Sequence, residues 1–328
     1  MDRDDDRVPP QLRPQPHHFR FPLEAALRSV VALEAEVPPS AFTAEVLGTE
    51  RAGSGVVIHE NGLVLTIGYL VCEAADIRIE TADGRVTPGV LLAYDFETGF
   101  GLVQATRPLG VPPAELGRAA DVRVGERLLV AAAGGREQAV ACRLVRRRPF
   151  AGYWEYMIED ALFTAPAHPF WGGTGCFDGS GLLVGIGSLL VQSGDERHLE
   201  RTNMIVPVDL LLPILDDLRV HGRARRRPRP WLGLYLEESE SGLLVLGTAR
   251  GGPAERAGLE AGDRIYEIGG LPVADLADFY EILWGLGEAG VAVPLAVLRD
   301  DRRLALTLVS ADRDRFLARR PPDRAGGS

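Results

Sequence analysis

The sequence predicts a mainly β protein, because short apolar runs dominate its first two thirds. Between residues 22 and 218, runs rich in Val, Ile and Leu are separated by Gly, Asp and Pro. Two of the separators contain Asn61-Gly62 and Asp83-Gly84, dipeptides that favour tight hairpin turns because such turns need positive φ. Many short strands at this spacing favour a closed antiparallel barrel or a pair of barrels.

Length and charge limit the class of protein. The chain has 328 residues and is 46% hydrophobic, which allows two domains with separate cores. Its net charge of -10 argues against nucleic acid as the main partner, since backbone phosphates must be neutralised by cations. The first 20 residues are charged and rich in proline, and no stretch reaches the ~18 apolar residues that span a bilayer. We therefore expect a cytoplasmic protein without a membrane span.

Three widely spaced cysteines, Cys72, Cys142 and Cys176, match no metal-ligand or Cys-x-x-Cys spacing. Their odd number also argues against a disulfide framework. We expect buried apolar thiols in a reducing compartment, and we predict no metal and no other cofactor.

Composition divides the chain into five predicted segments. Residues 1–21 and 313–328 lack apolar periodicity and are expected to be disordered tails. Residues 22–218 form the first domain, which a helix with Asp209 as its N-cap is expected to close. Residues 219–230 contain six arginines with interspersed proline and predict a solvated linker, with an anion-binding surface as the alternative. Residues 231–312 form the second domain.

Four segments of the first domain carry a family resemblance. They read "GSGVVIHENGLVLTIGYLV" (53–71), "LLAYDFETGFGLVQA" (91–105), "FTAPAHPFWGGTGCFDGSGLLVGI" (163–186) and "TNMIVPVDLLLPIL" (202–215). In this order they resemble the segments around the catalytic residues of HtrA/Deg-type trypsin-like serine proteases. The resemblance implies a double antiparallel β-barrel for this domain.

The resemblance places changed residues at all three catalytic positions. The histidine position is Tyr69, the aspartate position is Gly99 and the serine position is Thr174. A phenol with a pKa of about 10 is a poor proton acceptor at neutral pH, and general-base catalysis contributes roughly 10²–10⁴-fold. Since Gly99 has no side chain that could orient a base, we predict a pseudoprotease with no intact catalytic residue.

A remnant of the oxyanion hole is expected in the backbone of Gly172, Gly173 and Thr174, because main-chain donors do not depend on side chains. Cys176 and Phe177 replace the small residue and the proline that follow the nucleophile in the family. We expect this bulkier pair to alter the pocket beside the oxyanion donors.

An alternative is an endopeptidase with residual or unconventional activity, in which Thr174 or Cys176 attacks and the base comes from elsewhere. His168 and His59 do not occupy the base position, and we interpret them as surface histidines. Asp95 and Glu97 lie near the acid position and are interpreted as turn residues.

The second domain contains "PAERAGLEAGDRIYEIGGLPV" at residues 253–273, and it resembles a bacterial PDZ domain along its whole length. The resemblance implies a small α+β domain that binds a peptide by adding it as a strand to a sheet edge. The loop that receives the terminal carboxylate is Trp231-Leu232-Gly233-Leu234, with Phe279 and Leu283 completing an apolar pocket. In the alternative, the groove is empty or is occupied by the protein's own chain.

The sequence thus predicts a trypsin-like double barrel followed by a PDZ domain, acting as a non-enzymatic scaffold or regulator that binds C-terminal or extended peptides. A third possibility is a regulatory subunit that co-assembles with an active protease of the family. The resemblance also implies a homotrimer formed through the N-terminal stretch, where Phe19 and Phe21 lie.

Overall fold

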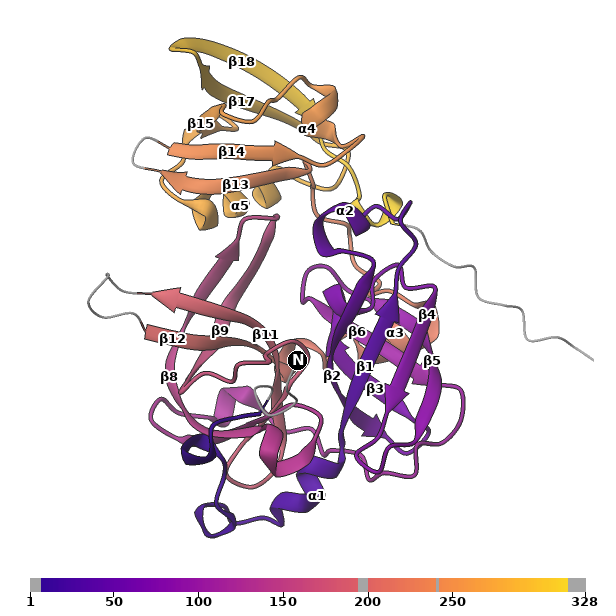
Figure 1. Ribbon diagram of the computed structural model, residues 1–328. Helices are drawn as coiled ribbons and strands as arrows, with labels where there is room; N and C mark the ends of the chain where they lie inside the picture. The colour runs from indigo at the N-terminus through magenta and orange to yellow at the C-terminus, as the bar shows by residue number, and fades with distance from the viewer. Residues whose placement is uncertain (1–6, 194–199, 240–241, 318–328) are drawn as a thin grey trace, which may run out of the picture. The chain divides into compact units, whose positions relative to one another are not determined.

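The computed structural model describes residues 7–193, 200–239 and 242–317. The chain divides into two compact units. The first unit comprises residues 1–148 and 160–225, and the second comprises residues 149–159 and 226–328. The two barrels and the C-terminal sheet follow one another along the chain (Figure 1).

The first barrel of the first unit closes in the strand order β1-β2-β3-β6-β5-β4. Its strands are β1 (Val30–Glu36), β2 (Glu50–His59), β3 (Leu63–Ile67), β4 (Asp76–Glu80), β5 (Val86–Tyr94) and β6 (Phe100–Ala105). The predicted turn at Asn61-Gly62 joins β2 to β3, and the one at Asp83-Gly84 joins β4 to β5. Both hairpin predictions are confirmed.

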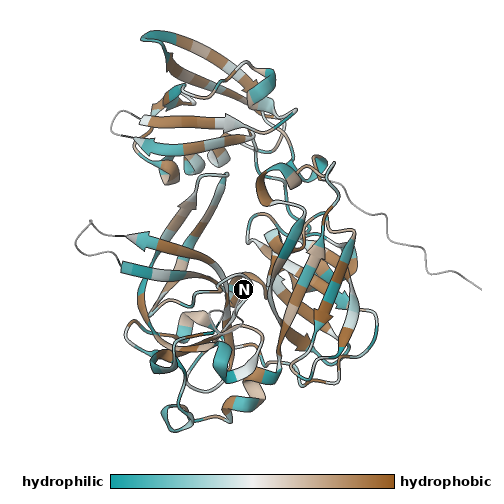
Figure 2. Ribbon diagram, in the orientation of Figure 1, coloured by the Kyte–Doolittle hydropathy of each residue, from teal (hydrophilic) through white to brown (hydrophobic). Residues whose placement is uncertain are grey.

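The second barrel closes in the order β10-β11-β12-β9-β8-β7. Its strands are β7 (Arg127–Ala131), β8 (Ala139–Gly152), β9 (Tyr156–Ala165), β10 (Gly175–Phe177), β11 (Leu183–Ser193) and β12 (Glu200–Pro207). Hydrophobic residues, in brown in Figure 2, recur along the strands of both barrels and are interrupted by hydrophilic ones, because alternate side chains point to opposite faces.

The helices of the first unit are short and connect the strands. The α-helices are α1 (Leu23–Arg28), α2 (Ala44–Leu47) and α3 (Leu215–His221), and the 3-10 helices are η1 (Pro10–Leu12), η2 (Pro16–His18), η3 (Gly68–Leu70), η4 (Ala119–Asp121), η5 (Gly135–Gln138) and η6 (Val208–Leu210). The mainly β fold class predicted from the sequence is confirmed.

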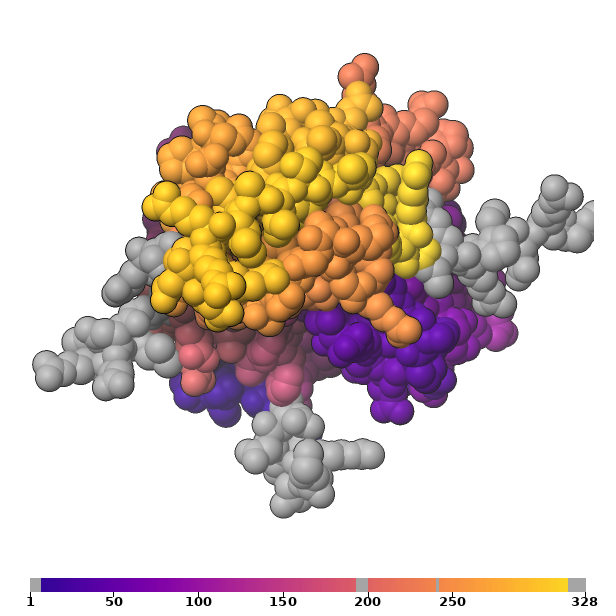
Figure 3. Space-filling view, turned by 90° about the horizontal axis from the view of Figure 1, so that it is seen from above, coloured from indigo at the N-terminus to yellow at the C-terminus, as the bar shows by residue number. Residues whose placement is uncertain are grey.

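The second unit contains a sheet in the order β13-β14-β15-β17-β18, with β16 paired to β15. Its elements are β13 (Leu234–Ser239), β14 (Gly242–Thr248), α4 (Pro253–Arg256), β15 (Arg264–Ile268), β16 (Leu271–Pro272), α5 (Leu276–Gly285), β17 (Ala292–Arg299), β18 (Arg302–Val309) and η7 (Arg313–Arg315). Figure 3 shows the surface of this unit from the side of β18, in yellow.

Local sequence explains how helix α5 begins. The Asp275 carboxylate accepts a hydrogen bond from the Asp278 backbone N–H at 2.9 Å, which is N-cap geometry. Leu276, Phe279 and Leu283 follow at helical spacing and are buried in the core of the second unit.

The expected tails need correction where the structure describes them. Val8 is fully buried in the core of the second barrel, and the Arg13 guanidinium donates to its carbonyl at 2.8 Å. At the other end, the ring of Phe316 contacts that of Trp231, with centroids 4.7 Å apart. Apolar residues at these isolated positions find partners far away in the sequence, which periodicity does not reveal. Residues 1–6 and 318–328 lie outside the described residues.

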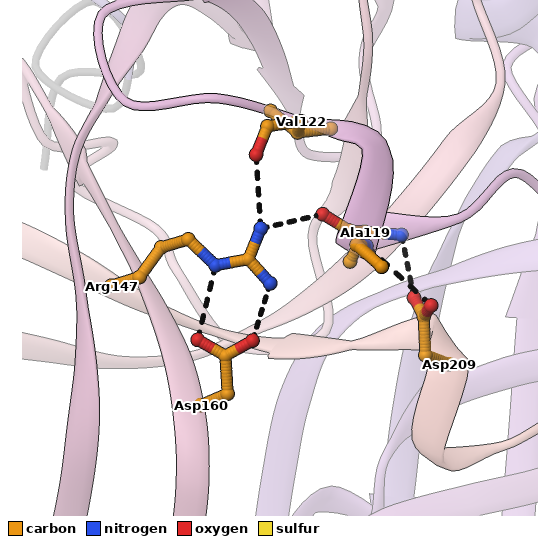
Figure 4. Close-up of polar contacts among 6 residues, drawn as sticks. Ala119, Val122, Arg147, Asp160 and Asp209 are labelled. Atoms are coloured by element: carbon orange, nitrogen blue, oxygen red, sulfur yellow. Dashed lines mark hydrogen bonds and ion pairs between the residues drawn. The ribbon is translucent and has the colours of Figure 1, made fainter.

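The sequence predicted Asp209 as the N-cap of the helix that follows it, and this prediction is wrong. Its carboxylate instead accepts a hydrogen bond from the backbone N–H of Ala119, 90 residues earlier, at 2.5 Å (Figure 4). Beside it, the Arg147 guanidinium pairs with Asp160 through two hydrogen bonds and donates to the Ala119 and Val122 carbonyls at 2.9 Å. This Arg147–Asp160 pair links β8 to β9 within the first unit.

Candidate functional site

Tyr69 lies on η3, directly after strand β3, and its side chain points to the loop that carries Thr174. Its hydroxyl donates to the Ser188 carbonyl on β11 at 2.8 Å. A Cβ on Gly172 would lie only 3.0 Å from the same hydroxyl oxygen. Burial raises the pKa of Tyr69 above its ordinary value, so the phenol is neutral and acts as a hydrogen-bond donor.

Gly99 lies beside Tyr69, as the order of the motifs requires. Its carbonyl accepts a hydrogen bond from the Gly68 backbone N–H at 2.7 Å, and its φ is +80°. This backbone conformation favours glycine, so the position is suited to a turn. The fold therefore brings Tyr69 and Gly99 together, but Gly99 provides no carboxylate.

The loop of Gly172, Gly173 and Thr174 is held between strands of both barrels. The Gly172 carbonyl accepts from the Ser54 N–H at 2.9 Å, and the Gly173 N–H donates to the Gly187 carbonyl at 2.9 Å. Gly187 in turn donates to the Thr174 carbonyl at 2.8 Å. These bonds fix the loop at the junction of the two barrels.

Thr174 is fully buried, and both of its hydrogen-bond donors are directed to one acceptor. Its hydroxyl donates to the Trp171 carbonyl at 3.0 Å, and its backbone N–H donates to the same oxygen at 3.3 Å. In this arrangement the Thr174 backbone N–H already donates to the Trp171 carbonyl, so it is not available to a substrate oxyanion. The loop that carries the predicted nucleophile position is therefore closed by its own hydrogen bonds.

Sequence reasoning missed Arg51, which supports the turn that carries Tyr69. The guanidinium is buried and donates to the Tyr69 carbonyl at 2.9 Å, to the Cys72 carbonyl at 3.1 Å and to the Thr43 hydroxyl at 2.9 Å. An arginine in a β-strand carries no signal of such a role, because its partners lie up to 21 residues away.

The interpretation of His168 as a surface residue was wrong, because it is fully buried. Its Nδ1 accepts from the Phe170 N–H at 3.0 Å, so its Nε2, 3.0 Å from the Gln138 carbonyl, carries the proton. Burial lowers the pKa of this imidazole. Both ring nitrogens are engaged in local structure, away from Thr174.

His59 lies in the turn between β2 and β3, where its Nδ1 accepts from the Asn61 N–H at 3.2 Å. Asp95 accepts from the backbone and the hydroxyl of Thr98 at 2.9 and 2.6 Å, as a turn residue does. Glu97 lies two residues further along the same loop between β5 and β6.

Cys176 lies in the core of the second barrel with Cys142. Burial raises the pKa of its thiol well above the ordinary value, which disfavours the nucleophilic thiolate. All three cysteines are buried and unpaired, as predicted. Among the described residues, no group of three or more His, Cys, Asp and Glu side chains could hold a metal ion.

The predicted carboxylate loop of the second unit holds a carboxylate from the protein's own chain. The backbone N–H groups of Leu232, Gly233 and Leu234 donate to Oε1 of Glu155 at 3.2, 2.6 and 2.8 Å. Leu232 also lies 3.0 Å from Oε2. Three successive main-chain donors on one carboxylate form an anion-binding site.

The other predicted groove residues have different roles. The Trp231 N–H donates to the Ala311 carbonyl at 3.0 Å and is therefore not part of the carboxylate loop. Phe279 and Leu283 are fully buried in a core cluster that also contains Leu232 and Leu234. Their assignment to a peptide pocket stays a prediction.

Comparisons with known proteins agree with this architecture. A family model described as a trypsin-like peptidase domain matches residues 53–186, and one described as a PDZ domain matches residues 230–309. A relative named probable periplasmic serine endoprotease DegP-like, from Ectopseudomonas mendocina, is 28% identical over 78% of this chain. The putative serine protease HhoA from Synechocystis is 26% identical over 79% of this chain and 70% of its own length.

The chain combines a trypsin-like peptidase domain with a PDZ domain, and it is similar to HtrA-type proteases over most of its length. Solved HtrA structures share its fold: "HtrA-type protease AlgW with decapeptide" has a TM-score of 0.53 at 22% identity, covering 92% of this chain and 100% of that one. The serine endoprotease from Yersinia pestis has a TM-score of 0.51 at 19% identity, covering 88% and 96%. This chain spans about half the length, 56%, of the DegP-like relative.

The prediction that this chain is not an enzyme is corrected by these findings. Its relatives are named serine endoproteases, and its structural neighbours are named proteases. The changed residues occupy three positions, whereas the similarity to the DegP-like relative extends over more than three quarters of the chain. Thr174 also keeps a hydroxyl at the predicted nucleophile position.

The names of the DegP-like relatives bear on the predicted location, because these relatives are named periplasmic whereas a cytoplasmic location is predicted for this chain. No described helix is both long and apolar enough to cross a membrane. Phe19 and Phe21 contact each other, with ring centroids 5.4 Å apart, and the trimer stays a prediction.

Proposed function

We propose that this HtrA-type protein binds polypeptides through the carboxylate loop of its PDZ domain and acts on them as an endopeptidase with Thr174 as the nucleophile. The observation that carries the proposal is the convergence of the Leu232, Gly233 and Leu234 N–H groups on one carboxylate. Such a loop recognises the chain terminus of a peptide added as a strand to the sheet edge.

Peptide-bond hydrolysis on this proposal requires the closed loop to open. The Thr174 hydroxyl must leave the Trp171 carbonyl before it can attack a substrate, and the same movement frees the Thr174 N–H as an oxyanion donor. Tyr69 is neutral and hydrogen-bonded, so it supplies no general base, and the hydroxyl proton passes to a water molecule as the Thr174 oxygen attacks the peptide carbonyl. We therefore expect turnover roughly 10²–10⁴-fold below that of a relative with an intact triad.

The catalytic part is tested by replacing Thr174 with alanine. We expect cleavage of casein and of a fluorogenic peptide by the full chain to disappear in Thr174→Ala, because no other hydroxyl occupies the nucleophile position. Thr174→Ser should retain cleavage, since it keeps the hydroxyl and removes the crowding methyl group.

Thr202→Ala is the matched control, because Thr202 is an equally buried threonine on β12 of the same barrel. Its cleavage rate should equal that of the wild type. Cleavage that persists unchanged in Thr174→Ala would refute Thr174 as the nucleophile.

The binding part is tested with two leucine-terminated decapeptides that differ only in a free or amidated C-terminus. Calorimetry with the full chain should show at least about 10-fold weaker binding of the amidated peptide, because amidation removes the charge that the loop stabilises. Equal affinities would mean that residues 232–234 do not recognise a terminal carboxylate.

A further inference from the structure

Residues 149–159 comprise the end of β8, the turn at 153–155 and the start of β9, and they belong to the second unit although both strands are part of the second barrel. Along the chain this segment lies between Arg147 and Asp160, whose ion pair holds the two strands together (Figure 4). We call residues 149–159 the hairpin tip. No feature of its sequence indicated that it would pack with the PDZ domain.

The anchor of the hairpin tip is the Glu155 carboxylate, which is held by the carboxylate loop. Glu155 is only 7% exposed, and its φ of +55° is uncommon for a residue with a long side chain. The surrounding contacts must therefore hold this backbone conformation. Burial raises the pKa of the Glu155 carboxyl, while the three backbone N–H donors and the charge of Arg313 act in the opposite direction.

Further hydrogen bonds follow the two walls expected of a PDZ groove, strand β13 and helix α5. The Leu236 N–H on β13 donates to the Tyr153 carbonyl at 2.9 Å. On α5, the Tyr280 hydroxyl donates to the Gly152 carbonyl at 2.6 Å and accepts from the Glu155 N–H at 3.1 Å. Both walls therefore bind the main chain of the hairpin tip.

Apolar contacts complete the arrangement. Met157 is 8% exposed and belongs to the core cluster that includes Leu234, Phe279 and Leu283, the residues predicted to form the peptide pocket. The Arg313 guanidinium donates to the Trp154 carbonyl at 3.1 Å. The hairpin tip thus combines a carboxylate in the loop, a backbone bond to β13 and an apolar side chain in the core.

We propose that the hairpin tip is a built-in ligand of the PDZ groove, with Glu155 in place of a peptide's terminal carboxylate, and that an incoming C-terminal peptide must displace it. The proposal rests on the proposed function and assigns the regulation of that site. A second carboxylate cannot use the same three N–H donors while Glu155 accepts from them, so the two ligands are mutually exclusive.

The first test measures hydrogen exchange of the full chain by mass spectrometry. Glu155→Ala should speed exchange in residues 149–159 and in residues 232–236, because these amides lose their shared anchor. Glu159→Ala is the matched control, since Glu159 is an exposed residue of the same hairpin tip with the same charge. It should leave both segments unchanged.

The second test measures binding of the free and amidated decapeptides to the same variants. Because only the open fraction of the protein binds, Glu155→Ala should bind the free peptide at least about 10-fold more tightly than the wild type or Glu159→Ala. Should Glu155→Ala fail to fold, Glu155→Asp serves instead, because its shorter side chain keeps the charge but draws the carboxylate back from the loop.

The outcomes separate this inference from the proposed function. Equal free-peptide affinities for Glu155→Ala and the wild type, or unchanged exchange in Glu155→Ala, would overturn the built-in ligand and leave peptide recognition intact. Faster exchange in Glu155→Ala without binding of either peptide would support occupancy by the hairpin tip and refute recognition of peptide C-termini.

Discussion

Replacing Gly173 with alanine is expected to destabilise the first unit by about 3 kcal/mol or more. A Cβ at this position would lie 1.8 Å from the Ser54 carbonyl oxygen and 2.6 Å from the Thr66 hydroxyl oxygen, and φ is +76°. The cost combines left-handed backbone strain of roughly 1–2 kcal/mol with overpacking of roughly 1–3 kcal/mol. Urea unfolding followed by circular dichroism measures the change.

Gly84→Ala separates the two contributions. Gly84 also lies in the first unit and has almost the same φ, +79°, but nothing lies within 4 Å of a Cβ placed there. This variant should lose only the roughly 1–2 kcal/mol of backbone strain. Equal losses in both variants would mean that the loop of Gly173 relaxes away from Ser54, contrary to the close packing described.

Replacing Asp263 with alanine is expected to destabilise the second unit by about 1.5–3 kcal/mol, because it removes a buried carboxylate that accepts hydrogen bonds from the charged Arg299 side chain, which is 27% exposed. Asp263 is 1% exposed and accepts from Nε and Nη2 of Arg299 at 2.6 and 2.7 Å. It also accepts from the Glu260 N–H at 3.0 Å. Thermal unfolding of the full chain, with hydrogen exchange to locate the change, measures the loss.

Glu260→Ala is the matched control, since the Glu260 carboxylate contacts the same guanidinium at 2.8 Å but is 68% exposed. An exposed pair contributes about 0–1 kcal/mol, so this variant should stay close to the wild type. A loss as large as that of Asp263→Ala would show that burial does not decide the strength of this network.

The contribution of Asp263 should also depend on pH. Burial alone would raise the pKa of Asp263, but the hydrogen bonds from Arg299 and Glu260 and the Arg299 charge outweigh it and hold the pKa below its ordinary value. The stabilisation is therefore present above the unfolded carboxyl pKa of about 4 and is lost as pH falls through the folded value. The difference in the free energy of unfolding between the wild type and Asp263→Ala should therefore become smaller at acidic pH.

Local sequence was sufficient to predict a structural feature wherever that feature depends on neighbouring residues. The Asn61-Gly62 turn is set by the backbone freedom of glycine, and Gly62 has a φ of +83°. The turn at Asp300-Asp301 has φ values of +47° and +60°, as a two-residue hairpin requires. These features were predictable because their cause lies within a few residues.

Long-range partners were not predictable in the same way. Asp209 has the composition of an N-cap, yet it binds the backbone of Ala119, and Glu155 binds a loop 77–79 residues away. Nothing in the sequence around Asp209 or Glu155 distinguishes either residue from an acidic residue that is exposed to solvent. The motifs located the site positions, but only the fold shows which donors are already engaged, as at Thr174.

Tethering gives the hairpin tip an advantage that a free peptide lacks. The turn that carries Glu155 is continuous with β8 and β9, so Glu155 meets the carboxylate loop at an effective concentration of order millimolar. A weakly binding C-terminus must approach that concentration before it occupies half of the grooves. The hairpin tip would therefore raise the apparent Kd of the groove for chain ends, so that only abundant or unusually tightly binding chain ends occupy it.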